Sequence, residues 1–231
     1  MRVDRKTHKT VLVQILKEIY IDTSIGPILG FKGGTAAYLF YDLGRFSVDL
    51  DFDLLDENKE EYVFVTIDKI LKGFGTIKEK HQKRHTIFFV LSYAGEAQNI
   101  KVEISTRSFG SRYELKNYLG ISMLVIVKED MFAHKLVALM ERGKTANRDI
   151  FDIWSFLKNN WAINKEMVEK RTGLPFKEYL KKCIDFVESH SDRYILAGMG
   201  ELLDEEQKAW AKANLKKDLL FLLKVTYENE S

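Results

Sequence analysis

An acidic stretch over residues 46–54 constrains the fold of this chain more than any other segment. Apolar residues occupy every second position from Phe46, and the positions between them are Ser47, Asp49, Asp51 and Asp53. This period of two predicts a half-buried β-strand. Aspartate is disfavoured in strands, and like charges two positions apart repel unless a cation lies between them. The face is therefore either a site for a hard divalent ion such as Mg²⁺ or the charged, solvated face of an edge strand.

The composition is ordinary for a globular protein and excludes several classes of function. The 231 residues suffice for one large or two small domains, and 45% of them are hydrophobic. A formal net charge of +2 demands no polyanionic partner, although it leaves local basic patches open. The single cysteine, Cys183, excludes an internal disulfide and a cysteine-rich zinc site. The charged N-terminus and short apolar runs predict neither a signal peptide nor a membrane span, and we expect a cytoplasmic protein.

A glycine pair lies between a short apolar strand, residues 27–31, and an apolar, helix-compatible segment, residues 36–41. In the sequence Lys32-Gly33-Gly34-Thr35, bare backbone N–H groups can approach an anion at the start of the helix. Thr35 is a candidate to cap that helix or to contact phosphate. A plain tight turn has the same pattern, so the glycines alone do not decide between the two.

Periodicity predicts helices over residues 8–21 and 57–73, and strands over residues 76–80, 86–93 and 100–105. The strand over 86–93 is almost continuously apolar, which predicts a central position. The basic segment 78–85 is expected to be a hairpin turn, either solvated or in contact with nucleic acid. Glu103 faces away from the apolar side of its strand, and its significance depends on whether that strand lies beside the acidic one.

From about residue 128 the pattern is helical, which predicts a mixed α/β domain, 1–127, and a helical domain, 128–231. In the helix expected over 128–142, Lys135 falls on the apolar face, where it either extends to water or points at a buried anion.

Two aspartates in the next predicted helix, residues 146–158, share a face with apolar side chains. At least one of Asp149 and Asp152 therefore needs a buried partner. An ion pair of Asp149 with Arg142 or Arg148 would provide that partner, and its role would be purely structural.

The order of these motifs resembles the nucleotidyltransferase superfamily typified by DNA polymerase β. More closely, segments 32–35 and 45–51 resemble the first motif of the AbiEii/AbiGii toxin family. Segments 135–139 and 148–152 resemble that family's later motifs, a helical Lys-Leu-x-x-Leu and Arg-Asp-x-x-Asp. One departure is Gly34, where many relatives in the wider superfamily have Ser.

The resemblance implies an α+β fold: a polymerase β-like nucleotidyltransferase core, with a mixed sheet and flanking helices, followed by an all-helical C-terminal region. It implies that Asp49, Asp51 and Glu103 hold two Mg²⁺ or Mn²⁺ ions, and that Lys135, oriented by Asp149, supplies positive charge to a triphosphate. Thr35 or Ser47 would replace the hydroxyl missing at position 34. The predicted nucleotide ligands are Lys32, Gly33, Gly34, Thr35, Arg45, Ser47, Lys135, Arg142 and Arg148.

The resemblance also implies an enzyme that transfers NMP from an NTP to an acceptor hydroxyl with release of pyrophosphate. Its biological role would be that of a toxin, paired with a cognate antitoxin, in a toxin–antitoxin or abortive-infection system for phage defence. The first-choice acceptor is the 3′ end of tRNA, and the basic segments 78–85 and 165–182 are candidate RNA contacts. Two alternatives stay open: NMP transfer to a protein side chain, and a non-catalytic nucleotide-binding regulatory module.

Overall fold

The computed structural model describes residues 4–93, 95, 98–143 and 147–230. The chain divides into two compact units, of which the first ends at Val127 and the second begins at Lys128. Each unit has its own buried core.

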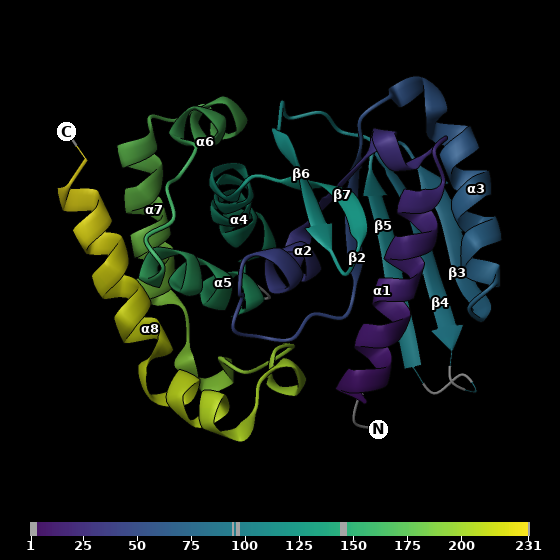
Figure 1. Cartoon of the computed structure of the whole chain (residues 1–231). Coiled ribbons are helices and arrows are strands. Elements are labelled where there is room, and N and C mark those ends of the chain that lie inside the picture. Colours follow the sequence, from purple (N-terminus) through teal and green to yellow (C-terminus); the bar gives the residue numbers. More distant parts are fainter. Residues whose placement is uncertain (1–3, 94, 96–97, 144–146, 231) are drawn as a thin grey trace. The chain divides into compact units, whose positions relative to one another are not determined.

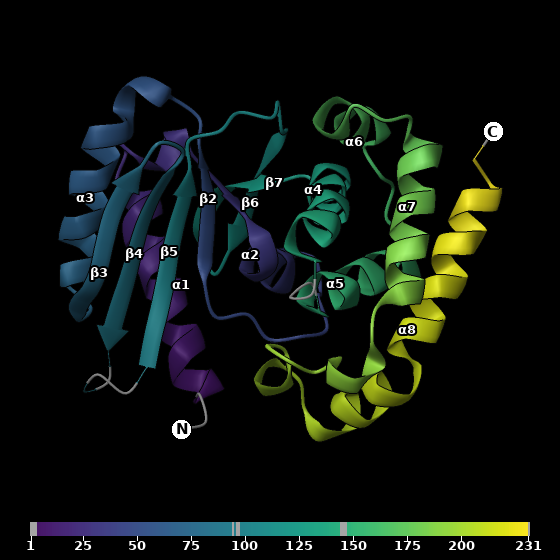
Figure 2. The same ribbon diagram turned by 180° about the vertical axis from the view of Figure 1, so that it is seen from behind.

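A seven-stranded mixed sheet forms the first unit, in the order β3-β4-β5-β2-β1-β7-β6 (Figures 1 and 2). The strands are β1 (Leu29–Lys32), β2 (Leu50–Leu54), β3 (Thr76–Lys83), β4 (Thr86–Tyr93), β5 (Gln98–Ser105), β6 (Tyr113–Tyr118) and β7 (Ile121–Ile126). The pairs β1–β7 and β2–β5 are parallel, and the other neighbours are antiparallel. The acidic strand β2 is therefore an interior strand, which excludes the interpretation of its charges as protection of a sheet edge.

Helices cover both faces of this sheet, which confirms the predicted mixed sheet with flanking helices. Helices α1 (Arg5–Ile21) and α3 (Glu60–Lys72) lie on one face, and α2 (Gly33–Phe40) lies on the other (Figures 1 and 2). Helix α1 buries residues spaced three and four apart, namely Leu12, Ile15, Leu16 and Ile19. The ring of Tyr20 at its end lies 6.4 Å from that of Phe52 on β2, so the apolar face of the acidic strand packs against α1. The charged face of β2 is thereby directed to the side of α2.

Several boundaries differ from the sequence-based predictions. The acidic strand begins only at Leu50, and 27–31 contains a 3-10 turn, Gly26–Ile28, before β1. The basic segment 78–85 is not a turn: β3 continues to Lys83, and only Arg84 and His85 connect it to β4. Strand β4 is interior but lies next to the edge strand β3 rather than at the centre.

The hairpin of β6 and β7 was not predicted from the sequence. Its turn, Leu119-Gly120, has positive φ at both positions, 51° and 82°, as a two-residue turn of the I′ type requires. Strand β6 is at the edge of the sheet and has no buried residue, so its sequence lacks the apolar alternation that marks a half-buried strand.

The second unit is helical, as predicted. It contains α4 (Lys128–Arg142), α5 (Asn147–Lys158), α6 (Lys165–Thr172), α7 (Phe176–Ser189) and α8 (Glu205–Glu228). A capping box of Asp204 and Gln207 starts α8, and Trp154 of α5 packs on Trp210 of α8 with ring centroids 4.2 Å apart. Throughout the described ranges, no helix combines the length and apolarity needed to cross a bilayer.

Candidate functional site

The parallel pairing of β2 with β5 places Asp51 directly beside Glu103. Residues in register on neighbouring strands project from the same face of a sheet, so both carboxylates point to the same side. Asp49 immediately precedes β2, and its Oδ1 accepts a hydrogen bond from the backbone N–H of Lys101 on β5 at 3.4 Å. We call Asp49, Asp51 and Glu103 the acidic face.

The acidic face has the oxygen donors that Mg²⁺ and Mn²⁺ prefer. A Cβ built on Gly33 would lie 2.2 Å from Oδ2 of Asp51. The carboxylate therefore packs against the Gly33 backbone, in space that a side chain at position 33 would occupy. Among the residues that the structure describes, no three His, Cys, Asp or Glu side chains are gathered into a ready metal site. The donor chemistry thus fits a divalent ion at Asp51 and Glu103, and the full three-carboxylate site stays a prediction.

Helix α2 begins at Gly33, earlier than predicted, and its N-cap is the backbone of Lys32. The expectation that Thr35 caps this helix is wrong, because Thr35 lies inside the first turn. Its side chain is fully buried and its hydroxyl donates a hydrogen bond to the carbonyl oxygen of Asp49. Thr35 therefore holds the start of the acidic strand, which leaves its hydroxyl engaged rather than directed at a phosphate.

Gly33→Ala is expected to destabilise the protein and to reduce its activity. The φ angle of Gly33 is +76°, which costs a non-glycine residue about 1–2 kcal/mol, and the new methyl would displace the Asp51 carboxylate. Gly120→Ala is the matched control, because Gly120 has φ +82° and no atom within 4 Å of its built Cβ. Thermal unfolding and nucleotide transfer would be measured for both variants, and equal losses in the two would contradict a special role of Gly33.

The side chains of Arg45 and Ser47 pack against the second glycine, Gly34. A Cβ built on Gly34 would lie 2.8 Å from Oγ of Ser47 and 3.0 Å from Nη2 of Arg45. Both side chains are nearly buried, and Arg45 donates from Nη1 to the carbonyl oxygen of Phe46 at 3.1 Å. The Ser47 hydroxyl thus occupies the space that a side chain at position 34 would enter, which is consistent with Ser47 replacing a hydroxyl at that position.

His8 of α1 is a further contact to the acidic strand that the sequence did not indicate. Its Nε2 donates to the carbonyl oxygen of Val48 at 2.9 Å, and its Nδ1 is hydrogen-bonded to the hydroxyl of Tyr93. Since Thr35 holds the next carbonyl, that of Asp49, side chains from two helices fix consecutive peptide groups ahead of β2. A lone histidine on an apolar helix face carries no pattern from which this contact could have been inferred.

The stability of the first unit is expected to fall as the pH drops below about 6.5. Burial lowers the pKa of His8, against the opposing effects of its bond to Val48 and the charge of Asp49. Between the folded and unfolded pKa values the unfolded state binds more protons, so protonation favours unfolding. Urea unfolding at pH 7.5 and 5.5 would show a smaller difference for His8→Gln than for the wild type. Burial also lowers the pKa of His190, so His190→Gln is the comparison variant for a histidine in the second unit. If the pH dependence of unfolding in His8→Gln equals that of the wild type, the assignment to His8 is refuted.

Lys32 and Asp53 form an ion pair beside the acidic face. Nζ of Lys32 lies 2.6 Å from Oδ1 of Asp53, and the hydroxyl of Tyr113 donates to Oδ2 of the same carboxylate. Burial, and then the charge of Asp53, raises the pKa of Tyr113, so this hydroxyl stays a donor. The ring of Tyr113 lies over Gly30, where a Cβ would come within 2.2 Å of it. Lys32 thus has a structural partner, and its predicted role as a nucleotide ligand stays a prediction.

In the second unit, Lys135 joins two fully buried carboxylates. Its Nζ lies 3.0 Å from Oδ1 of Asp149 and 2.8 Å from Oδ2 of Asp152. Arg142 adds a second cation, with Nη1 3.1 Å from Oδ2 of Asp149. We call these four residues the buried ion-pair cluster. It explains how a lysine can occupy the apolar face of α4, because the side chain reaches two buried anions rather than water.

Arg148 has a different partner from the one considered in the sequence analysis. Its Nε donates to the carbonyl oxygen of Gly198 at 2.7 Å, which ties the start of α5 to the segment before α8. Its predicted contact with nucleotide stays a prediction.

The structure brings most predicted residues of the first unit together around β2, namely Gly33, Gly34, Arg45, Ser47, Asp49, Asp51 and Glu103. The predicted residues of the second unit that meet are Lys135, Arg142 and Asp149. The contacts of His8 and Tyr113 were not predicted from the sequence, and Asp152 had no predicted role.

Comparisons with known proteins identify one family by sequence and solved structures that share the fold. The model of the family described as "Nucleotidyl transferase AbiEii toxin, Type IV TA system" matches residues 14–217. The crystal structure of JHP933 from Helicobacter pylori is similar, with a TM-score of 0.63 and 20% identity, over 99% of this chain and 94% of that one. An antigenic nucleotidyltransferase-like protein from Paracoccidioides brasiliensis has a TM-score of 0.54 and 15% identity, over 83% of this chain and 91% of that one. No curated protein matches the chain by sequence.

Proposed function

Because the chain belongs to the AbiEii toxin family of nucleotidyltransferases, we propose that it transfers NMP from an NTP to the 3′-terminal hydroxyl of an RNA, with tRNA as the first choice. The reaction depends on Mg²⁺ or Mn²⁺, and a cognate antitoxin restrains it. The observation that carries this proposal is the register of β2 and β5, which sets Asp51 beside Glu103 and against the bare backbone of Gly33.

The residues around β2 have different roles in this reaction. Gly33 and Gly34 open the backbone at the start of α2 to the phosphates, because N–H groups at a helix N-terminus attract anions. Arg45 and Ser47, which close against Gly34, supply further donors for the same phosphates.

The acidic face is the place for the divalent ions, held by Asp49, Asp51 and Glu103. When bound, such ions supply Lewis-acid chemistry that stabilises the attacking and leaving oxygens. The acceptor hydroxyl gives up its proton to water, and its oxygen forms a bond to the α-phosphorus. The bond from that phosphorus to the oxygen shared with the β-phosphate breaks, and pyrophosphate leaves. Thr35 and His8 keep Asp49 in place by holding the two peptide carbonyls before β2.

The buried ion-pair cluster gives Lys135 a defined position. In our proposal Lys135 contributes positive charge to the triphosphate, and Asp149 orients it. Its side chain as a whole is 13% exposed.

Incubation with each α-labelled NTP, Mg²⁺, total RNA and total cell protein tests the proposal. We expect label in RNA, with one NTP preferred, and no label when EDTA removes the metal. Periodate oxidation destroys the 3′-terminal diol, so oxidised RNA should accept nothing, whereas untreated RNA is the matched control. Label in protein would replace RNA by a protein side chain as acceptor. NTP binding without any transfer would favour the regulatory module.

A further inference from the structure

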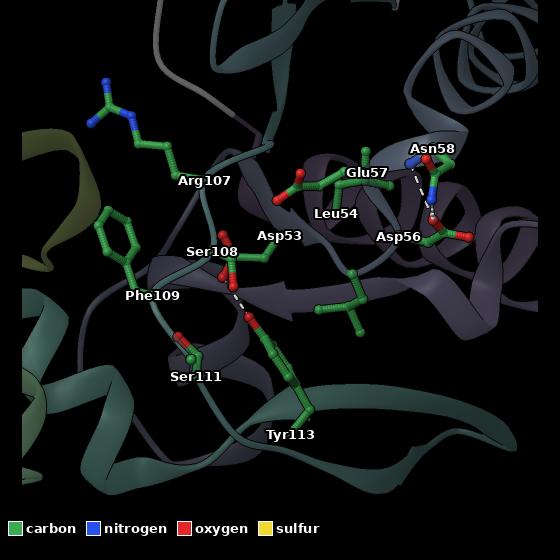
Figure 3. A pocket seen from close by; sticks show the side chains of 12 residues that line it. Asp53, Leu54, Asp56, Glu57, Asn58, Arg107, Ser108, Phe109, Ser111 and Tyr113 are labelled. Atoms are coloured by element: carbon green, nitrogen blue, oxygen red, sulfur yellow. Dashed lines mark hydrogen bonds between the residues drawn. The ribbon is translucent and has the colours of Figure 1, made fainter.

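A cavity of about 370 Å³ opens in the first unit where β2 and β5 end (Figure 3). One wall is the segment that follows β2, residues 53–58, and the other is the connection from β5 to β6, residues 107–113. Figure 3 shows the Asp53–Tyr113 hydrogen bond between Arg107 and Phe109 on one side and Asp56 and Asn58 on the other. None of the reaction steps above uses this cavity.

The cavity lies beside the acidic face, on the side away from Ser47. Asp53 follows Asp51 by two residues on β2, so its side chain projects from the same face about 7 Å farther along the strand. Gly34 and Ser47 meet at the opposite end of this strand. The carboxylate of Asp51 therefore lies between the glycine turn and the cavity. Phosphoryl transfer needs its attacking and leaving oxygens in line on opposite sides of the phosphorus. In the proposed reaction the phosphates lie at the glycine turn, so the attacking oxygen would come from the side of the cavity.

The charges of the cavity do not suit a triphosphate. Asp56 and Glu57 lie in its wall, and the charge of Asp53 is already met by Lys32. Carboxylates repel phosphate but accept hydrogen bonds from the hydroxyl and amino groups of a nucleoside. The volume is near the lower end for ligand cavities, about 300 to 1,000 Å³, which suits one nucleoside.

Two other side chains complete a site for a terminal nucleotide. Phe109 is half-buried and offers an aromatic ring, on which any base can stack. Arg107 is exposed, and its guanidinium suits the phosphate that precedes the last nucleoside of an RNA.

We propose that this cavity binds the 3′-terminal nucleoside of the RNA acceptor and presents its hydroxyl to the acidic face. The inference rests on the proposed function, because it assigns the second substrate of the same reaction. Phe109 stacks on the terminal base, Arg107 contacts the preceding phosphate, and Glu57 accepts from a hydroxyl or amino group.

Binding of a short fluorescent RNA, measured by anisotropy without NTP, tests the cavity directly. Phe109→Leu keeps an apolar side chain but removes the ring, and we expect it to weaken binding about tenfold. Arg107→Ala should weaken binding as well. The matched controls are Phe221→Ala on α8 and Arg193→Ala, both exposed residues of the second unit, which should bind RNA like the wild type.

The same RNA with a 3′-phosphate probes the charge of the cavity. It should bind more weakly than the RNA with a free 3′-hydroxyl, and Glu57→Gln should recover part of the difference. In the transfer assay, Phe109→Leu should raise the KM for RNA and leave the KM for NTP unchanged.

Each outcome bears on one or both of the two proposals. If RNA is labelled but Phe109→Leu and Arg107→Ala behave like their controls, the cavity assignment fails and the proposed function stands. A raised KM for NTP in Phe109→Leu would show that the cavity holds the nucleotide donor, and equal binding of the 3′-phosphorylated RNA would also overturn the assignment. If the two variants lose RNA binding while the wild type labels only protein, the cavity binds RNA that is not the acceptor, and both RNA as acceptor and the cavity assignment fail.

Discussion

Asp51→Ala is expected to abolish nucleotide transfer while the first unit stays folded. Asp51 and Glu103 lie beside each other on one sheet face, and two like charges in register repel when no cation separates them. Removing one of them should leave the metal-free protein as stable as before or more stable. The Asp51 carboxylate is proposed to hold ions that stabilise the transition state. Its loss should therefore lower the rate of transfer by at least about a hundredfold.

Transfer of label from NTP and thermal unfolding would be measured side by side. Asp68→Ala is the control. Asp68 belongs to α3, which lies on the face of the sheet opposite to Asp51, and its carboxylate pairs with Lys72 and Lys80. It should retain wild-type transfer. Wild-type turnover in Asp51→Ala would show that the acidic face is not the metal site.

The same variant tests the link between chemistry and toxicity. Over-expression of the wild type should halt growth, and Asp51→Ala should be harmless at an equal protein level. A catalyst at low concentration modifies many acceptors, whereas a stoichiometric binder occupies only as many targets as it has copies. An Asp51→Ala protein as toxic as the wild type would refute toxicity through nucleotide transfer.

Lys135→Met is expected to destabilise the second unit by about 3–5 kcal/mol, which is the usual cost of removing one partner from a buried ion pair. Its ammonium contacts both Asp149 and Asp152, each fully buried. The control is Lys181→Met, because the Lys181–Asp185 pair is more than half exposed, at 54% and 56%, and solvent screens such pairs so that they add little stability. Urea unfolding measures both variants, and equal losses would contradict the buried ion-pair cluster as a stabilising unit.

A second substitution separates the structural role of Lys135 from its proposed contact with the triphosphate. Arg142 also faces Asp149, and the Lys135 ammonium lies closer to Asp152, at 2.8 Å, than to Asp149, at 3.0 Å. Adding Asp152→Asn to Lys135→Met should therefore restore much of the stability. In this double variant the KM for NTP should be raised roughly ten- to a hundredfold if Lys135 meets the phosphates. A wild-type KM would assign Lys135 to folding alone.

The sequence by itself determined the features that depend on neighbouring positions. The alternation around Asp51 predicted a strand, the spacing in α1 and α4 predicted helices, and the glycine pair predicted a strand-to-helix turn without side chains. Four motifs in order identified the family. Edge strand β3 was predicted to end too early, and edge strand β6 was not predicted, because strands exposed on both faces have no apolar alternation.

Only the tertiary structure decided which of these residues act together. Glu103 became a partner of Asp51 through the parallel register of β2 and β5, which joins residues 52 positions apart in the chain. The ion-pair partner of Lys32 became visible only in the fold, which places Asp53 2.6 Å from its ammonium. Local sequence fixes the face on which a side chain lies, but it does not encode which strand lies beside it. That choice is made by the packing of whole strands and helices around one core, where burial of many apolar groups outweighs the preference of any single charge.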